Sequence, residues 1–356
     1  MRNKKSGVIP GMIILMVFLS LFFSGCGENT DAYDQAGKDL RQGSYSYALS
    51  GYEQSIREGV MVPLSLRGAG ISCLRMAEYE KAADYFTRAL ACEEIKGSQR
   101  KDVLSYRANT WFKGGNYEKA MADCQTLAEE FGRDAEISFL CGSVALAMDS
   151  YEEARKEFDI SYMADSSYES AIRIYQEYLA RDMEADGTRY LEKALADHKE
   201  GTGNVCDRGR IYYYMEDYEK AAKELKEASN DGNSEAMLLL GMVFLARHDA
   251  SNARAMYQQF ISSEPKRCAK GYNGLALCDM EEEKYDSALQ NLSLGIPTAT
   301  TEEMQTILFN EIVVYERKLD FVTARNKAEE YLAMFPEDRT ISRELTFLRS
   351  RTRQNS

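Results

Sequence analysis

The residues that could carry out chemistry are few and dispersed. The chain of 356 residues has two histidines, His198 and His248, both in polar stretches. A metal centre or an activated nucleophile needs convergent ligands or a paired base, and neither histidine has a cysteine or carboxylate partner at helical spacing. The segment 201–203, Gly-Thr-Gly, is too short for a phosphate-binding loop. The sequence therefore predicts a protein that is not an enzyme and binds no metal or cofactor.

Cysteine thiols are the other reactive groups, and there are eight. One, Cys26, ends an apolar segment, and the remaining seven are Cys73, Cys92, Cys124, Cys141, Cys206, Cys268 and Cys278. This set of seven is odd in number and contains no Cys-x-x-Cys pair. A disulfide set is usual in a secreted chain. Here most cysteines fall on apolar helical positions, which favours buried free thiols that act as small apolar side chains.

The segment before Cys26 has the pattern of a secretory signal. Arg2, Lys4 and Lys5 precede an almost wholly apolar run at 8–23, and small residues follow it. Positive charge, apolar core and then small residues are typical of signal peptides. The run is about 16 residues long, whereas a membrane-spanning helix needs roughly 20.

The block Phe23-Ser24-Gly25-Cys26 resembles the lipobox of bacterial lipoproteins, with Phe23 in place of the usual Leu. The resemblance implies cleavage before Cys26 and a diacylglycerol anchor on its sulfur. Residues 1–25 would be the signal peptide, and 26–30 the lipidated cysteine with a short tether. The protein would face outward from the cell membrane, or sit on the outer membrane of a cell that has two. The alternatives are an uncleaved single-span anchor and a plain signal peptide with an incidental cysteine.

The net charge of the chain restricts the kind of molecule that it is predicted to bind. Loss of residues 1–25 lowers Lys+Arg from 44 to 41 against 57 acidic residues, so the net charge moves from −13 to −16. Nucleic-acid binding needs basic patches, and an acidic excess of this size excludes a nucleic-acid partner. With five prolines and no low-complexity stretch, the chain is predicted to form one continuous array rather than several linked domains.

These residues must be positioned by helices, because small and aromatic residues recur at steps of three and four. In the stretch 108–128, one predicted helix ends at Gly114-Gly115-Asn116 and a second carries Tyr117, Ala120, Cys124 and Leu127. The aromatic that begins the second helix recurs at Tyr45, Tyr79, Tyr117 and Tyr151, with spacings of 34, 38 and 34. We expect the four extra residues to form a polar loop at 96–100. A fifth copy is degenerate, with Glu184 and Gly187 where Tyr and Ala stand elsewhere.

A period near 34 with this small–aromatic–small order resembles the tetratricopeptide repeat. The resemblance covers residues 31–348 and implies an all-α solenoid of about nine helix-turn-helix repeats in a right-handed superhelix with a C-terminal capping helix. A related Sel1-type array is the local alternative. The predicted repeats lie near 31–61, 62–100, 101–133, 134–167, 168–200, 201–233, 234–266, 267–301 and 302–337, before a capping helix at 338–350 and a tail at 351–356.

In such arrays the first helices line a concave groove that holds the ligand. By register, the N-terminal groove would present Arg67, Arg75, Asn109 and Lys113, which resembles in part the carboxylate-holding clamp of peptide-binding members of the family. The middle groove would present the residue types that interfaces favour, namely aromatics, Met and Arg; these are Phe139, Gln176, Arg210, Tyr213, Tyr214 and Met242. The alternative for Tyr213 and Phe139 is packing between neighbouring repeats.

The resulting hypothesis is an anchored extracytoplasmic scaffold. It would bind a protein or peptide in its concave groove, attach to the membrane through Cys26, and take neither nucleic acid nor a small-molecule substrate. The alternative is a structural or assembly subunit of a cell-envelope complex that uses its convex or end surfaces.

Overall fold

The computed structural model describes residues 30–198, 205–336 and 338–352. These residues form nineteen α-helices and one short 3-10 turn, η1 (Ile296–Thr298), without β-strands. The first helices of successive pairs are α1 (Asp31–Arg41), α3 (Val62–Arg75), α5 (Gly97–Lys113), α7 (Ala135–Ala147), α9 (Tyr168–Leu179), α11 (Val205–Tyr214), α13 (Ser234–Ala246), α15 (Ala269–Glu281) and α17 (Thr301–Arg317). The second helices are α2 (Tyr45–Glu58), α4 (Tyr79–Leu90), α6 (Tyr117–Phe131), α8 (Tyr151–Ala164), α10 (Glu184–Asp197), α12 (Tyr218–Asn230), α14 (Ala250–Ser263), α16 (Tyr285–Gly295) and α18 (Phe321–Met334). The last helix is α19 (Arg339–Thr352).

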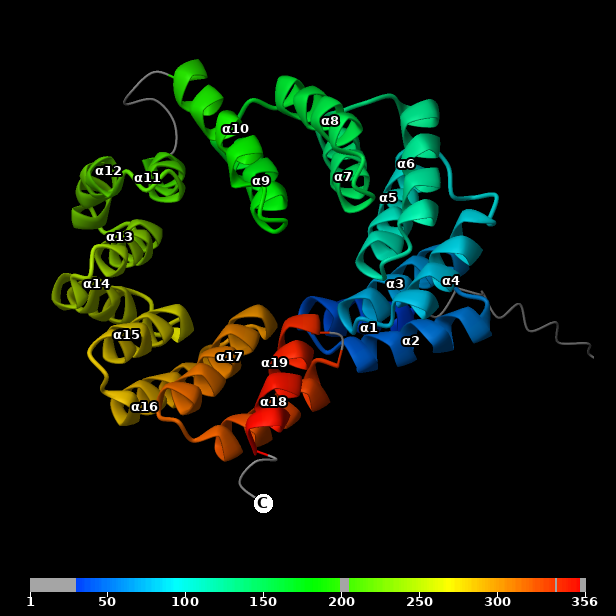
Figure 1. Ribbon diagram of the computed structural model, residues 1–356. Helices are drawn as coiled ribbons and strands as arrows, with labels where there is room; N and C mark the ends of the chain where they lie inside the picture. The colour runs from blue at the N-terminus through cyan, green and yellow to red at the C-terminus, as the bar shows by residue number, and fades with distance from the viewer. Residues whose placement is uncertain (1–29, 199–204, 337, 353–356) are drawn as a thin grey trace, which may run out of the picture.

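Consecutive helices pack against each other along the chain, as in a tetratricopeptide solenoid. The prediction of an all-α array of nine helix pairs with a C-terminal capping helix is confirmed. The array curves so far that it nearly closes on itself, and the orange helix α17 and the red helix α19 at its end approach the blue helices α1 and α3 at its start (Figure 1). The two ends of a chain of nine repeats therefore face one another.

The two helices of a pair pack through a small residue on the first helix and a large side chain 16 residues later on the second helix. A Cβ added at Gly70 would lie 2.7 Å from the ring of Phe86, and one at Gly142 would lie 2.7 Å from the ring of Phe158. Both rings are fully buried. A small residue on the first helix thus leaves the space that a large side chain on the second helix fills.

The degenerate fifth pair departs from this arrangement. Tyr175 occupies the position on the first helix that is Gly70 or Gly142 in other pairs, and its hydroxyl donates to Glu184 at 3.0 Å. Gly187 occupies the second-helix position that is Ala elsewhere, and a Cβ there would lie 3.0 Å from Tyr175. Gly187, smaller still than the usual Ala, therefore leaves the space that the large Tyr175 side chain needs, which explains the departure from the repeat pattern.

The turn inside each pair has one fixed conformation. The residue two positions before every second helix has a left-handed φ, between 57° and 78°; these residues are Gly43, Ala77, Gly115, Asp149, Asp182, Glu216, His248, Glu283 and Leu319. Two of the nine are glycine, the residue for which this conformation costs least. The common turn angle gives each pair the same geometry for stacking on the next.

The expected polar loop at 96–100 is wrong. Helix α5 begins at Gly97, so the four extra residues lengthen the first helix of the third pair instead of its preceding loop. Arg100 and the next residue, Lys101, have partners that hold the first turn of α5 in place. Arg100 Nε donates to Glu130 at 2.7 Å, and Lys101 pairs with Asp134, the residue that caps α7.

The prediction of free thiols is confirmed for the seven cysteines of the described chain. None forms a disulfide, and all are buried except Cys92, which is half-buried. Burial raises the pKa of the Cys73 thiol to about 12 and that of Cys206 to about 11. Such thiols stay protonated and act as small apolar side chains.

The capping helix packs against the last pair, and one of its contacts brings two glutamate side chains together. Ile341, Leu345 and Leu348 of α19 are buried against the ninth pair. Glu316 of α17 meets Glu344 of α19, and burial first and then Glu344 raise the pKa of Glu316 to about 7. Its Oε1 atom is buried without a hydrogen-bond partner in the described residues.

We expect this pair to make the cap sensitive to pH. The pKa of Glu316 in the folded protein exceeds that of an unfolded glutamate, about 4.3, so its stabilising contribution is complete below pH 4.3 and is lost as the pH rises through 7. Glu316→Gln should stabilise α19 by about 1–2 kcal/mol at pH 8, after allowance for partial screening by solvent, and should have little effect at pH 4.5. Amide hydrogen exchange of α19 measures this, with the exposed Glu118→Gln as control. Equal protection in Glu316→Gln and wild type at pH 8 would contradict it.

Candidate partner-binding groove

The first cavity of the groove, here called the N-terminal cavity, lies where the ends of the array meet. Its volume is about 670 Å³. The first three pairs contribute Gly43, Tyr45, Leu74, Arg75, Met76, Ala77, Tyr79, Tyr106, Asn109 and Lys113, and the end of the array contributes Thr301, Glu302, Gln305, Met334, Phe335, Pro336 and Asp338. The cavity thus exists because nine repeats turn far enough to bring α17 opposite α3 and α5.

Three of the four residues predicted for the N-terminal groove come together here. Arg75 lies at the end of α3, and Asn109 and Lys113 lie one turn apart on α5. Within the described chain, neither Arg75 nor Lys113 has an ion-pair partner. The cavity therefore contains two positive charges and an amide that are available to an acidic ligand group.

Two carboxylates share the cavity, and they differ in availability. Asp338 is already used: its Oδ2 accepts from the Tyr331 hydroxyl at 2.6 Å, and its Oδ1 accepts from the backbone N–H of Thr340 at 2.9 Å at the start of α19. The Glu302 side chain lies in the first turn of α17 and has no partner among the residues described. A helix N-terminus stabilises a carboxylate in that position.

Arg67, the fourth predicted residue, lies outside the cavity. Its Nη2 donates to Asp102 Oδ1 at 3.1 Å, its Nε donates to the other oxygen, and its guanidinium lies 5.3 Å from the centre of the Tyr106 ring. The hydrogen bond to Asp102 raises the pKa of Arg67. This arginine therefore joins α3 to α5 and is not free to bind a ligand.

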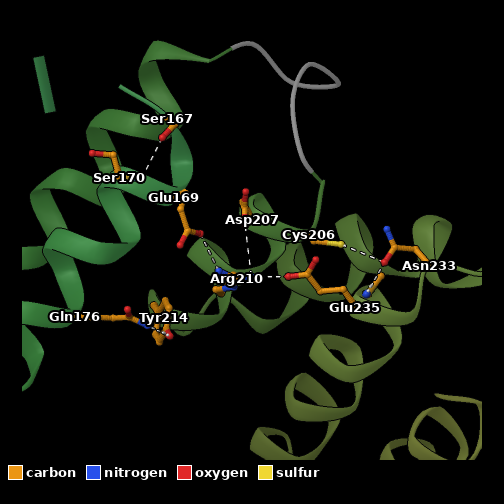
Figure 2. Close-up of polar contacts among 11 residues, drawn as sticks. Ser167, Glu169, Ser170, Gln176, Cys206, Asp207, Arg210, Tyr214, Asn233 and Glu235 are labelled. Atoms are coloured by element: carbon orange, nitrogen blue, oxygen red, sulfur yellow. Dashed lines mark hydrogen bonds and ion pairs between the residues drawn. The ribbon is translucent and has the colours of Figure 1, made fainter. Parts of the chain in front are cut away.

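Arg210 is engaged in the same way in the middle of the groove (Figure 2). Its guanidinium donates to Glu169 at 3.2 Å and to Glu235 at 2.6 Å, and lies 3.5 Å from Asp207. These carboxylates belong to α9, α13 and α11 respectively. Arg210 thus fastens three successive first helices together across the concave face.

The middle-groove aromatics divide between groove and core. Gln176 Nε2 donates to the Tyr214 hydroxyl at 2.9 Å across α9 and α11 (Figure 2), and the Tyr214 ring lies 5.0 Å from that of Tyr175. Tyr213 packs against Tyr218 of its own pair, with ring centres 5.9 Å apart, and burial raises its pKa. Tyr213 therefore packs within its own helix pair rather than projecting into the groove.

Phe139 is half-buried between its neighbours. Its ring lies 5.9 Å from that of Phe158, and the Arg173 guanidinium stands 4.2 Å from its centre. Arg173 also donates to Glu136 at 2.7 Å. This stack links α7 to α9, so Phe139 contributes to the contact between the fourth and fifth pairs.

Met242 is the most accessible of the predicted middle-groove apolar side chains, at 39% exposure. It lines a second cavity of about 490 Å³, here called the C-terminal cavity, together with Arg210. The two cavities lie on either side of α17, because Glu302 lines both.

The histidines connect neighbouring pairs. His198 Nε2 lies 2.8 Å from the backbone oxygen of Ser166, and His248 Nδ1 lies 2.6 Å from Glu281 Oε1. In the residues that the structure describes, no group of three or more His, Cys, Asp or Glu side chains has the arrangement of a metal site. No described helix is both long enough and apolar enough to cross a bilayer. The predicted signal peptide and Cys26 lie outside the described residues.

The register of the sequence repeats did not predict the residues of the last pair that line the N-terminal cavity. Gln305 and Glu302 occupy groove positions on the first helix of the ninth pair, and the repeat pattern could have named them. It could not place them opposite Arg75, because that placement depends on the total turn of nine pairs.

The sequence comparison agrees with this geometry in part of the array. Residues 206–261 match the family model described as tetratricopeptide repeat, a segment within the sixth and seventh helix pairs. The fold is a solenoid of tetratricopeptide type. No curated protein matches the chain in sequence.

Solved structures give similarity in fold alone. A tetratricopeptide repeat protein from Parabacteroides merdae has 17% identity and a TM-score of 0.43, with 70% of this chain and 97% of that chain covered. A human IFIT1 dimer solved with PPP-AAAA has 16% identity and a TM-score of 0.47, with coverage of 90% and 81%. The Cut9–Hcn1 hetero-tetramer of APC/C has 15% identity and a TM-score of 0.40, with coverage of 93% and 65%. At these values no ligand transfers to this chain.

Proposed function

We propose that this protein is a membrane-anchored, extracytoplasmic lipoprotein that holds a segment of a protein partner in its concave groove. Tetratricopeptide-type folds generally bind proteins. The observation that carries the proposal is the N-terminal cavity, where Arg75, Asn109 and Lys113 line a space of about 670 Å³. The ligand group is a carboxylate of the partner, either a side chain or a chain end.

Charge supports a specific site there. The net charge is −13 for the chain, and several arginines of the first helices are neutralised by acidic neighbours, as Arg67 is by Asp102 and Arg173 by Glu136. Arg75 and Lys113 form no ion pair in the described chain; an acidic group on which Lys113 acts is Glu177, whose pKa burial raises and Lys113 partly lowers. A carboxylate that reaches both gains charge-assisted hydrogen bonds, and the acidic remainder of the surface disfavours non-specific binding of acidic proteins.

The anchor is supported by the sequence alone. The block Phe23-Ser24-Gly25-Cys26 follows an apolar run with a basic start, and the described array begins four residues after Cys26, at Thr30. A tether this short holds the array close to the membrane, so the partner is a protein of the same envelope face. No enzymatic step is part of this proposal.

The experiment is a crosslinking pull-down of the full-length protein from its own cells, with the variant Arg75→Ala/Asn109→Ala/Lys113→Ala beside the wild type. The expected result is loss of one specific partner, because the variant removes both cations and the amide. Loss of a charge-assisted contact at each cation weakens binding by roughly 10-fold or more.

Two controls make the pull-down decisive. Lys223→Ala/Lys226→Ala removes two exposed positive charges from the outer helix α12 and should retain every partner. Arg67→Ala tests the arginine that is ion-paired outside the cavity. An identical set of partners in wild type and the triple variant would refute the N-terminal cavity as the site and favour a structural role through the outer faces.

A further inference from the structure

The C-terminal cavity lies along the first helices of four successive pairs, α11, α13, α15 and α17, and Tyr257 of the second helix α14 also lines it. Its volume of about 490 Å³ lies within the range of ligand pockets, about 300–1,000 Å³. It is a separate hollow from the N-terminal cavity, and α17 stands between the two.

The floor of this cavity is apolar. Leu239, Tyr257 and Ile307 are buried beneath it, and Met242 is exposed at its surface. Gly274 opens the floor, because a Cβ there would lie 2.4 Å from the Tyr257 ring. The absence of a side chain at Gly274 lets the Tyr257 ring line the cavity. The floor is therefore shaped to receive an apolar side chain.

After the ion pairs within the protein are taken into account, the charge that remains on the rim of the cavity is negative. The positive charge of Arg210 is neutralised by ion pairs with Glu235 and Glu169. Glu303 accepts from the backbone N–H of Thr300 at 2.8 Å in a capping box, with Lys270 at 4.0 Å. This leaves the Glu302 side chain, which has no partner in the described chain. The unmatched charge on the rim is negative, which complements a cation.

We infer that the C-terminal cavity binds a large apolar side chain of the partner segment and that a Lys or Arg nearby in that segment pairs with Glu302. This inference rests on the proposed function, because the segment is the one held in the groove. Since Glu302 lines both cavities, the segment crosses α17. Its acidic group lies in the N-terminal cavity, and its apolar and basic residues lie on the other side.

The test selects peptides from a phage-displayed library of random 12-residue sequences on the immobilised full-length protein. Enriched sequences are then synthesised and their affinities measured. The expected peptides carry a large apolar residue within about four positions of Lys or Arg. Met242→Glu should weaken their binding roughly 10- to 100-fold, the effect of losing one buried apolar contact. Glu302→Gln should weaken it by a smaller factor, about 3- to 5-fold.

Matched variants separate this inference from the proposed function. Met163→Glu places the same charge at a methionine that is 77% exposed on the outer helix α8 and should leave affinity unchanged. Enriched peptides that depend on Arg75 and Lys113 but bind Met242→Glu normally would overturn this inference and leave the proposed function standing. The inference would also be overturned if no variant changes binding, if the enriched peptides are acidic and lack an apolar residue, or if no peptide is enriched.

Discussion

Replacement of Cys26 by Ser is expected to move the protein completely from the membrane fraction to the soluble fraction. The sulfur of Cys26 is the predicted attachment point of a diacylglycerol, and a hydroxyl cannot replace it. Two acyl chains hold a protein stably at a bilayer, whereas a protein with none has no such anchor. The measurement is fractionation of cells that express the full-length chain, followed by mass determination of its N-terminal peptide, which should carry the lipid in the wild type alone.

Cys92→Ser is the matched control, because Cys92 is the one thiol of the described chain that is not buried. It should leave the protein in the membrane fraction. Retention of Cys26→Ser at the membrane, with residues 1–25 still attached, would show an uncleaved helical anchor instead. A wild-type protein that is soluble would show a plain signal peptide.

The repeat architecture was predictable because the same local packing contacts recur in each helix pair. The 34-residue spacing from Tyr45 to Tyr79 and the buried Ala82 and Phe86 that follow are set by contacts within one pair and its neighbour. The same local contacts explain the fifth pair, where Gly187 leaves space for the Tyr175 side chain. The lengthened α5 was missed because Arg100 and Lys101 in its first turns pair with Glu130 and Asp134, which lie about 30 residues further along the chain.

The groove was predictable only in part. Register placed Arg75, Asn109 and Lys113 on one face, and they line one cavity. It gave no sign that Arg67 and Arg210 are neutralised, because their partners Asp102 and Glu169 lie 35 and 41 residues away on neighbouring first helices. Nor could it show that α17 closes the N-terminal cavity, since small rotations accumulate over nine pairs before the ends meet.

The central claim is that the partner lies in the concave groove, and a photocrosslinking amino acid tests it most directly. p-Benzoylphenylalanine is placed at Gln305, which lines the N-terminal cavity, or at Tyr47, which is 74% exposed on the outer helix α2. After irradiation of intact cells, we expect one discrete adduct from position 305 and none from position 47. The adduct should disappear in the Arg75→Ala/Lys113→Ala background. An adduct from position 47 alone, or one from position 305 that persists without both cations, would contradict the account.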